Sequence, residues 1–194
     1  TGYDRGLDIK VDHTGNIYTC GYFVNTVDFD PGPGSFPVTS NGGGDVYITK
    51  LDALGNLIWA KNIGGAGVDD AAHLAVTAND EIIVGGRFFG VSDFDPGVAT
   101  FTLSSNGSGD VYVLRLDVSG NFIWARSFGG SSGDEGNAVT IDNAGSIYVT
   151  GNYYQSTVDF DPGPGTFTLS PMANGMDIYI SKFTSSGNFI WVKK

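Results

Sequence analysis

The sequence places three pairs of aspartates at a spacing that suits a hard metal ion. Each pair belongs to the motif Asp-Phe-Asp-Pro-Gly, and the paired residues are Asp28 and Asp30, Asp93 and Asp95, and Asp159 and Asp161. Side chains two positions apart in an extended segment point the same way, and the following Pro-Gly turn can bring backbone carbonyls toward them. Calcium takes about six to eight oxygen ligands of this kind. We therefore predict calcium sites at these loops, and the alternative is that each carboxylate only caps a turn.

These motifs belong to a repeat of about 65 residues. Trp59 and Trp124 stand 65 positions apart, Trp124 and Trp191 stand 67 apart, and an Asn and two apolar residues precede each tryptophan. The phenylalanine of each motif is expected to anchor its loop from the side opposite the aspartates; these residues are Phe29, Phe94 and Phe160. A unit of this length accommodates four strands.

Short β-branched and aromatic runs predict the strands of each copy. In the first copy they are LDIKVD, IYTCGYF, DVYITKLD and LIWAKNIG, with a long Gly/Pro-rich loop between the second and the third. Turns such as Asp52 to Gly55 join neighbouring strands, because Asp closes an Asx turn and Gly accepts positive φ. The second copy departs from this pattern and has Asn79-Asp80-Glu81 at one turn. The 30 glycines argue against helices, so the chain is expected to be all-β.

The later strands of each copy are apolar on both faces. Neighbouring residues such as Tyr47 and Ile48 are both apolar although they point to opposite sides, so both faces must be covered. Four-stranded antiparallel blades packed face to face in a β-propeller provide that cover, whereas a β-sandwich buries one face. We predict a β-propeller with three blades, residues 1–66, 67–132 and 133–194, and a sandwich or solenoid is the alternative.

Three blades are fewer than the roughly 4 to 8 that close a propeller. The 194 residues are therefore expected to form a partial propeller, or half of a six-bladed ring made by two copies. Exposed end strands can also pair with other strands. Self-association into a closed ring or a fibre is a further expectation.

The third copy, residues 133–194, closely resembles the SBBP-type β-propeller repeat, a relative of NHL repeats. Its marks are an Asp-x-x-Gly turn followed by Ile-Tyr, a Tyr-Ile-x-Lys strand and the Gly-Asn-Phe-x-Trp segment near the end. The resemblance extends over the whole chain and implies a bacterial secreted or cell-surface protein, with no catalytic residues attached to the family. The second copy departs at Asp95-Pro96-Gly97-Val98, which lacks the second Pro-Gly.

The charge is unevenly placed. The chain has 21 acidic and 10 basic residues and a net charge of −11. Consecutive antiparallel strands run in opposite directions, so alternate loops lie at the same end of the blades. Fourteen acidic residues are expected at one such end: Asp4, Asp28, Asp30, Asp45, Asp69, Asp70, Asp93, Asp95, Asp110, Asp134, Glu135, Asp159, Asp161 and Asp177. Such a face repels nucleic-acid phosphates and favours cations or basic partners. Solubility alone is the alternative. We expect no nucleic-acid partner, and no apolar run is long enough to span a membrane.

Patterns typical of catalysis are weak. His13 and His73 are not at equivalent repeat positions, which argues against a two-histidine metal site, and no Gly-x-Ser-x-Gly elbow occurs. The neighbouring acids Asp69-Asp70 and Asp134-Glu135 could serve a glycosidase only at a defined separation across a cleft, and solvated loop acids are the favoured interpretation. We therefore expect no enzyme.

Two functions follow. The first is a non-enzymatic extracellular or cell-surface scaffold or binding module, with an acidic loop face, calcium stabilisation and a protein or glycan partner. The alternative is a carbohydrate-binding or carbohydrate-active propeller whose central site is built from several blades. An enzyme should break the repeat with unique polar residues in one blade, and the small differences between the copies favour the scaffold.

Overall fold

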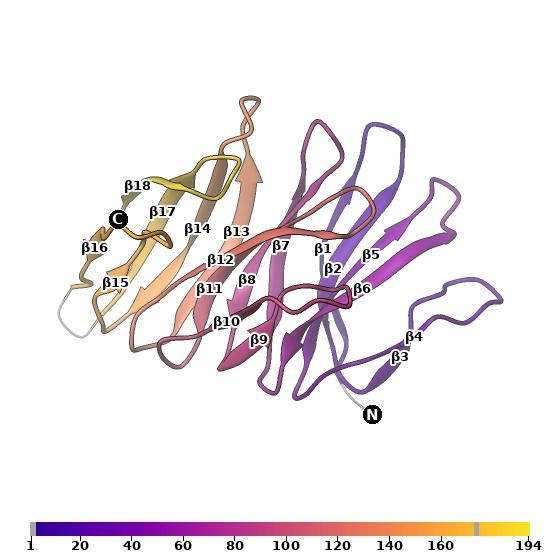
Figure 1. Ribbon diagram of the computed structural model, residues 1–194, viewed down its shortest axis with the longest axis horizontal. Coiled ribbons are helices and arrows are strands. Elements are labelled where there is room, and N and C mark those ends of the chain that lie inside the picture. The colour runs from indigo at the N-terminus through magenta and orange to yellow at the C-terminus, as the bar shows by residue number, and fades with distance from the viewer. Residues whose placement is uncertain (1–2, 173–174) are drawn as a thin grey trace.

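The computed structural model describes residues 3–172 and 175–194, and these residues form strands, turns and loops without a helix. Most strands belong to three antiparallel four-stranded units that stand side by side in Figure 1. Sheet 1 contains β1 (Arg5–Val11), β2 (Ile17–Phe23), β5 (Asp45–Leu51) and β6 (Leu57–Gly65). Sheet 2 contains β7 (Asp70–Val76), β8 (Ile82–Phe88), β11 (Asp110–Leu116) and β12 (Phe122–Phe128). Sheet 3 contains β13 (Asp134–Ile141), β14 (Ile147–Tyr154), β17 (Met176–Phe183) and β18 (Phe189–Lys193). The all-β prediction and its antiparallel sheets are confirmed.

Three short hairpins lie within the segments that the sequence predicted as loops. They are β3 (Thr26–Asp28) with β4 (Pro37–Thr39), β9 (Val91–Asp93) with β10 (Thr102–Ser104), and β15 (Val158–Asp159) with β16 (Thr168–Leu169). Strand β9 also pairs with the end of β6, and Asp159 at the end of β15 forms a bridge with Gly129. The hairpin of each later copy therefore ties its own sheet to the preceding one.

The Asp-x-x-Gly turns form as predicted. Asp52 Oδ1 accepts hydrogen bonds from the amides of Leu54 and Asn56, and Gly55 has a φ of 85°. In the second copy the hydroxyl of Thr77 accepts the equivalent bond from the Glu81 amide, and Asp80 takes the positive φ, 59°. A polar side chain therefore still caps this turn, although Thr77 replaces the usual Asp and Asp80 replaces the usual Gly.

The core lies between neighbouring sheets. Cys20 and Ile48 of sheet 1 pack in one cluster with Leu74 of sheet 2, and Val113 of sheet 2 packs in a second cluster with Val149 of sheet 3. Sheet 2 is thus buried on both faces, as the apolar pattern of its strands requires. Among the described residues no helix has the length and apolar character needed to cross a bilayer.

The outer faces of sheets 1 and 3 remain open. Ile9 and Val11 of β1 are 60% and 61% exposed, and Ile178 of β17 is 69% exposed. The repeat equivalent of Ile9 in sheet 2 is Leu74, which is fully buried against sheet 1. The end faces therefore present apolar positions that a neighbouring sheet covers elsewhere in the molecule.

Candidate functional site

The Asp-Phe-Asp-Pro-Gly loops are closed by their own backbone. Asp28 Oδ1 accepts hydrogen bonds from the amides of Phe36 (2.7 Å) and Asp30 (3.1 Å), and Asp30 Oδ1 accepts one from Gly32 (2.7 Å). The amide of Phe36 is the main cause that lowers the pKa of the exposed Asp28 carboxyl. The equivalent bonds recur at Asp93, Asp95, Asp159 and Asp161. The aspartates of each loop therefore act at least as turn formers.

The phenylalanine of each loop is an anchor, as predicted. Phe94 and Phe160 are 1% and 0% exposed, and Phe29 is half-buried. Phe94 meets Phe88 edge-on with ring centroids 5.3 Å apart and lies 4.9 Å from Tyr112. The same three-ring cluster occurs in the other copies. Aromatic packing thus fixes the loop that presents the carboxylates.

Calcium binding at these loops stays a prediction. Within residues 3–172 and 175–194 no group of three or more His, Cys, Asp or Glu side chains is arranged to hold a metal ion. A calcium ion at one loop would therefore draw its remaining ligands from backbone carbonyls, amide or hydroxyl oxygens, or water.

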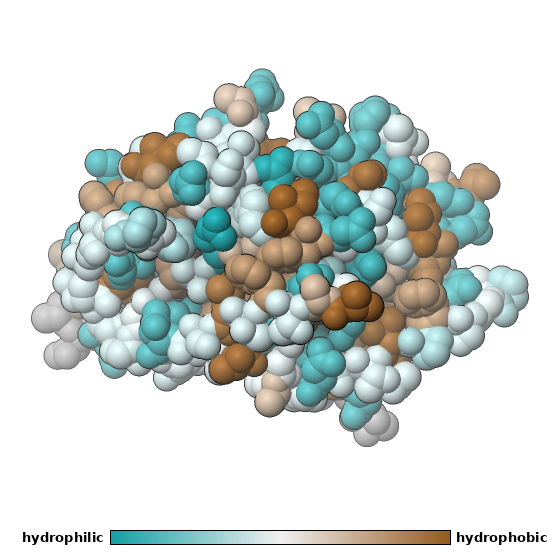
Figure 2. All heavy atoms as spheres, viewed as in Figure 1, coloured by the Kyte–Doolittle hydropathy of each residue, from teal (hydrophilic) through white to brown (hydrophobic). Residues whose placement is uncertain are grey.

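The predicted acidic face is smaller than the sequence suggested. Asp45, Asp69, Asp110 and Asp134 were counted among its fourteen acids, but they are between 0% and 2% exposed. Strand counting places a residue at one end of a sheet, yet it does not reveal that the next sheet covers these positions. Figure 2 shows apolar and polar residues interspersed over the viewed side of the molecule.

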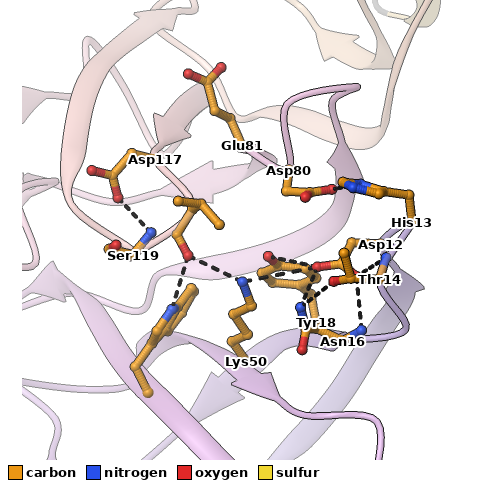
Figure 3. Close-up of polar contacts among 12 residues, drawn as sticks. Asp12, His13, Thr14, Asn16, Tyr18, Lys50, Asp80, Glu81, Asp117 and Ser119 are labelled. Atoms are coloured by element: carbon orange, nitrogen blue, oxygen red, sulfur yellow. Dashed lines mark hydrogen bonds and ion pairs between the residues drawn. The ribbon is translucent and has the colours of Figure 1, made fainter.

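At the opposite end of the sheets a polar network joins the turns of neighbouring units (Figure 3). The buried Lys50 ammonium lies 4.0 Å from Asp12 Oδ2 and 4.9 Å from the centre of the Tyr18 ring. Lys50 also donates to the carbonyl of Val118 in the turn between β11 and β12, as does the indole of Trp59. His13 meets Asp80 across the same gap at 2.7 Å. This network holds sheet 1 to the turn of sheet 2.

Hydrogen bonds keep Asp12 ionised within this network. Burial by itself raises the pKa of the carboxyl, but donors on Asn16 and Thr14 outweigh burial and hold the pKa well below its usual range. The buried Lys50 therefore faces a permanent negative charge.

The first strands of all three copies line a cleft of about 650 Å³. The cleft walls combine charged, aromatic and apolar side chains. Its lining residues include Tyr3, Arg5, Leu7, Tyr22, Val24, Val68, Asp70, His73, Arg87, Glu135 and Asn137. Two of them, Asp70 and Glu135, belong to the acid pairs that the sequence analysis interpreted as solvated loop residues. A site built from several blades was part of the alternative prediction, but these lining residues were not identified as its members.

Polar contacts within and between the sheets surround this cleft. Arg87 Nη2 lies 3.3 Å from Asp70 Oδ2 of the same sheet, and Arg87 Nη1 lies 3.0 Å from Glu135 Oε1 of sheet 3. His73 Nδ1 lies 3.2 Å from Asp8 Oδ2 of sheet 1. All three contacts involve side chains that are partly open to solvent. The site is thus polar, partly neutralised and accessible to a ligand.

The three copies differ in charge and polarity at the cleft. The positions equivalent to Arg5 hold Asp70 and Glu135, and the positions equivalent to Tyr22 hold Arg87 and Asn152. In contrast, the tryptophans and the motif phenylalanines recur in every copy. An alignment of the first and second strands of the three copies would have shown these differences and pointed to the cleft.

Family comparison agrees with this architecture. Residues 123–152, which run from β12 into β14, match the family model SBBP, described as a beta-propeller repeat. This segment is similar to one SBBP beta-propeller repeat. The match lies in the segment where the outer strand of sheet 2 passes into the first strands of sheet 3, so this propeller repeat spans a connection between two sheets.

Two longer proteins are similar to the chain. One is an uncharacterized WD repeat-containing protein of Acanthamoeba polyphaga mimivirus, which is 23% identical over 97% of this chain and 15% of its own length. The other is the regulatory protein FlaEY of Caulobacter vibrioides, which is 28% identical over 90% of this chain and 17% of its own length. The chain spans less than a fifth of either relative.

Proposed function

We propose that the chain is a non-enzymatic binding scaffold built from three propeller blades, which correspond to sheets 1, 2 and 3. The SBBP repeat at residues 123–152 and the stacking of four-stranded sheets support the propeller architecture. In this proposal the open faces at Ile9 and Ile178 are the places where further blades or a second copy pack.

The cleft between the first strands carries the proposal. Its lining residues differ in charge between the copies, a break of the repeat that would also suit the carbohydrate-binding or carbohydrate-active alternative, while the residues that pack one sheet on another repeat in phase. Residues that differ between copies are free to match one asymmetric partner, whereas repeated residues serve the shared architecture. We therefore assign partner recognition to the cleft and stability to the repeated positions.

The cleft chemistry favours a protein segment as the partner. Arg87, Asp70 and Glu135 offer charges of both signs, and Tyr3 and Tyr22 offer aromatic surface beside them. A peptide presents backbone amides, charges and apolar groups at similar spacing, so it can use all of these features. The names of the relatives, one WD repeat-containing and one regulatory, are consistent with a scaffold role. An extracellular or cell-surface setting is part of the proposal and is supported by the SBBP resemblance.

A peptide-display selection tests this function. The purified chain is used to select from a random peptide library, and selected peptides are measured by titration. We expect Arg87→Ala to weaken binding by about tenfold or more, because it removes the charge that bridges two sheets. Asp52→Asn, in an exposed turn remote from the cleft, is the control and should bind as the unaltered chain does.

Three results would overturn the proposal. They are the absence of any selected peptide, equal binding by the Arg87→Ala variant, or selective binding of oligosaccharides on a glycan array that Arg87→Ala abolishes. The last result would assign the cleft to carbohydrate instead.

A further inference from the structure

Each junction between neighbouring sheets buries two carboxyl groups. At the junction of sheets 2 and 3, Asp110 begins β11 and Asp134 begins β13, and they are 0% and 1% exposed. At the junction of sheets 1 and 2 the equivalent residues are Asp45 and Asp69, which are 0% and 2% exposed. The arrangement therefore occurs twice, at equivalent positions of the repeat.

One member of each pair is fully hydrogen-bonded. Asp134 Oδ2 accepts from the amide of Gly130 (2.7 Å) and Oδ1 from that of Tyr154 (3.4 Å). Asp69 likewise accepts from the Gly65 amide (2.8 Å) through Oδ2, and through Oδ1 from Ser92 (2.9 Å) and the Phe89 amide. These carboxyls have the donors that an ionised group requires.

The other member has an oxygen without a donor. Asp110 Oδ2 accepts from the Asn106 amide (3.0 Å), but among the described residues its buried Oδ1 has no hydrogen-bond partner. Asp45 repeats this arrangement, with Oδ2 bonded to Asn41 and Oδ1 unpartnered. A buried carboxylate oxygen without a donor is costly, and a proton on that oxygen lowers the cost because the neutral carboxyl loses less hydration on burial than the ion does.

A glycine at each junction leaves room for buried carboxyl oxygens. A β-carbon at Gly64 would lie 2.7 Å from Asp45 Oδ1 and 2.9 Å from Asp69 Oδ2. At the second junction, a β-carbon at Gly129 would lie 2.4 Å from Asp110 Oδ1. A larger residue would therefore press on both carboxyls at the first junction and on the Asp110 carboxyl at the second.

The groups around these carboxyls supply no positive charge. Within residues 3–172 and 175–194, none of the four aspartates forms an ion pair with Lys, Arg or His. At the second junction the titratable neighbours are Tyr179 of β17 and Glu135 of β13, and Glu135 is paired with Arg87. Asp159, which bridges to Gly129, directs its carboxylate to the amides of its own loop.

The first junction has equivalent neighbours. Tyr112 of β11 faces Asp69 and Asp70, the latter paired with Arg87, and the neutral amide of Asn62 donates to Asp45. Asp93, which pairs with Gly64, directs its carboxylate to the amides of Asp95 and Phe101 in its own loop. Two ionised carboxylates would therefore share a buried space with no compensating cation.

We propose that each junction holds one proton, carried on Oδ1 of Asp110 or Asp45, and that this proton locks neighbouring sheets together by removing the repulsion between the two buried carboxyls. The proton comes from water and binds without any covalent step. Burial raises the pKa of both Asp110 and Asp134 to about 6, and their mutual repulsion adds to the effect at Asp110. Burial also raises the pKa of Asp45 and Asp69.

The direction of the pH effect follows from these raised values. Because the folded state holds the proton more tightly than the unfolded chain does, the contribution of the pair to stability is fully present below about pH 4. It is lost as the pH rises through about 6. The junctions are therefore tighter in mild acid than at neutral or alkaline pH.

Replacement of Asp110 by asparagine tests the proposal, because an amide mimics the protonated carboxyl in shape and cannot ionise. We expect Asp110→Asn to melt about 3 °C or more above the unaltered chain at pH 8, with a difference near zero at pH 4. Asp177→Asn is the matched control. Asp177 occupies the same repeat position on β17, but it is only partly buried and lies 3.7 Å from Lys194. The melting temperatures of Asp177→Asn and the unaltered chain should differ by the same amount at pH 4 and at pH 8.

Two outcomes would overturn the proton lock. A lower melting temperature of Asp110→Asn at every pH would show that the ionised carboxylate is needed. A calcium-dependent rise in melting temperature that Asp110→Asn abolishes would replace the proton with a metal ion. If the variant does not fold, the carboxyl carbon of Asp110 is titrated by NMR in the unaltered chain. A midpoint above pH 5 supports the lock, and a lower midpoint excludes it.

Discussion

The two ends of the stacked sheets use buried aspartate in opposite ways. At the turn end, Asp12 lies among donors from Thr14 and Asn16 and faces the ammonium of Lys50. At the junction end, Asp110 has one donor for two oxygens and an acid as its neighbour. Asp110 is also the more deeply buried of the two, so stronger burial and a poorer supply of donors and cations both favour its neutral form.

This difference gives the two ends opposite pH dependence. Donors also lower the pKa of Asp142, the turn-end equivalent of Asp12, to about 2, with the Ser146 amide as the main cause. Such groups stabilise the fold above the unfolded pKa of about 4 and lose their contribution as the pH falls below it. The junction pairs lose theirs as the pH rises through about 6. We therefore expect maximal stability in mild acid.

The largest loss of stability is expected from a substitution at the turn end. Asp12→Ala leaves the Lys50 ammonium buried, with side-chain exposure of 6%, without its carboxylate. Loss of one partner of a buried pair costs about 3 kcal/mol or more. We predict a loss of that size in the free energy of unfolding at pH 7, measured by urea denaturation.

Asp142→Ala is the matched control for this variant. Asp142 lies 3.4 Å from Lys182, the equivalent of Lys50, but this pair is more exposed to solvent. Exposed pairs contribute little, so the control should lose much less stability than Asp12→Ala. Equal losses in the two variants would mean that burial of the pair has no energetic consequence, and the comparison of the two ends would fail.

A smaller effect is expected at the junction end from Gly64→Ala. Gly64 has a φ of 152°, and an added β-carbon would press on the carboxyl of Asp45. Strained backbone and overpacking each cost about 1 to 3 kcal/mol. We predict a loss in that range by urea denaturation at pH 7.

Gly133→Ala provides the control for the junction variant. Gly133 precedes sheet 3, and an added β-carbon would meet no atom within 4 Å. This variant should change the free energy of unfolding by about 0.5 kcal/mol or less. If Gly64→Ala is equally harmless, the carboxyl gap is not tightly packed, and the space assigned to the junction pair would have to be larger.

The sequence predicted the parts of this structure that depend on local pattern. Strands, Asp-x-x-Gly turns and the anchoring role of Phe94 follow from residues close together in the chain. The burial of Asp110 and the cleft around Arg87 depend on which sheet covers which loop, and that is a property of stacking. The acidic face was overestimated for this reason, since loop position alone does not distinguish a solvated aspartate from one beneath the next sheet.

The smallest expected effect concerns the loops with which the sequence analysis began. Because the Asp159 and Asp161 carboxylates already accept backbone amides, a bound calcium ion would add to a loop that is closed without it. We predict that calcium added after EDTA treatment raises the melting temperature by only about 2 °C, and that Asp161→Asn reduces this rise. Asp52→Asn, in an ordinary Asx turn, should keep the full rise. If calcium has no effect on any of the three chains, these aspartates are turn formers alone. A rise of many degrees would instead mean that the ion holds the loop, and the backbone bonds would then be secondary.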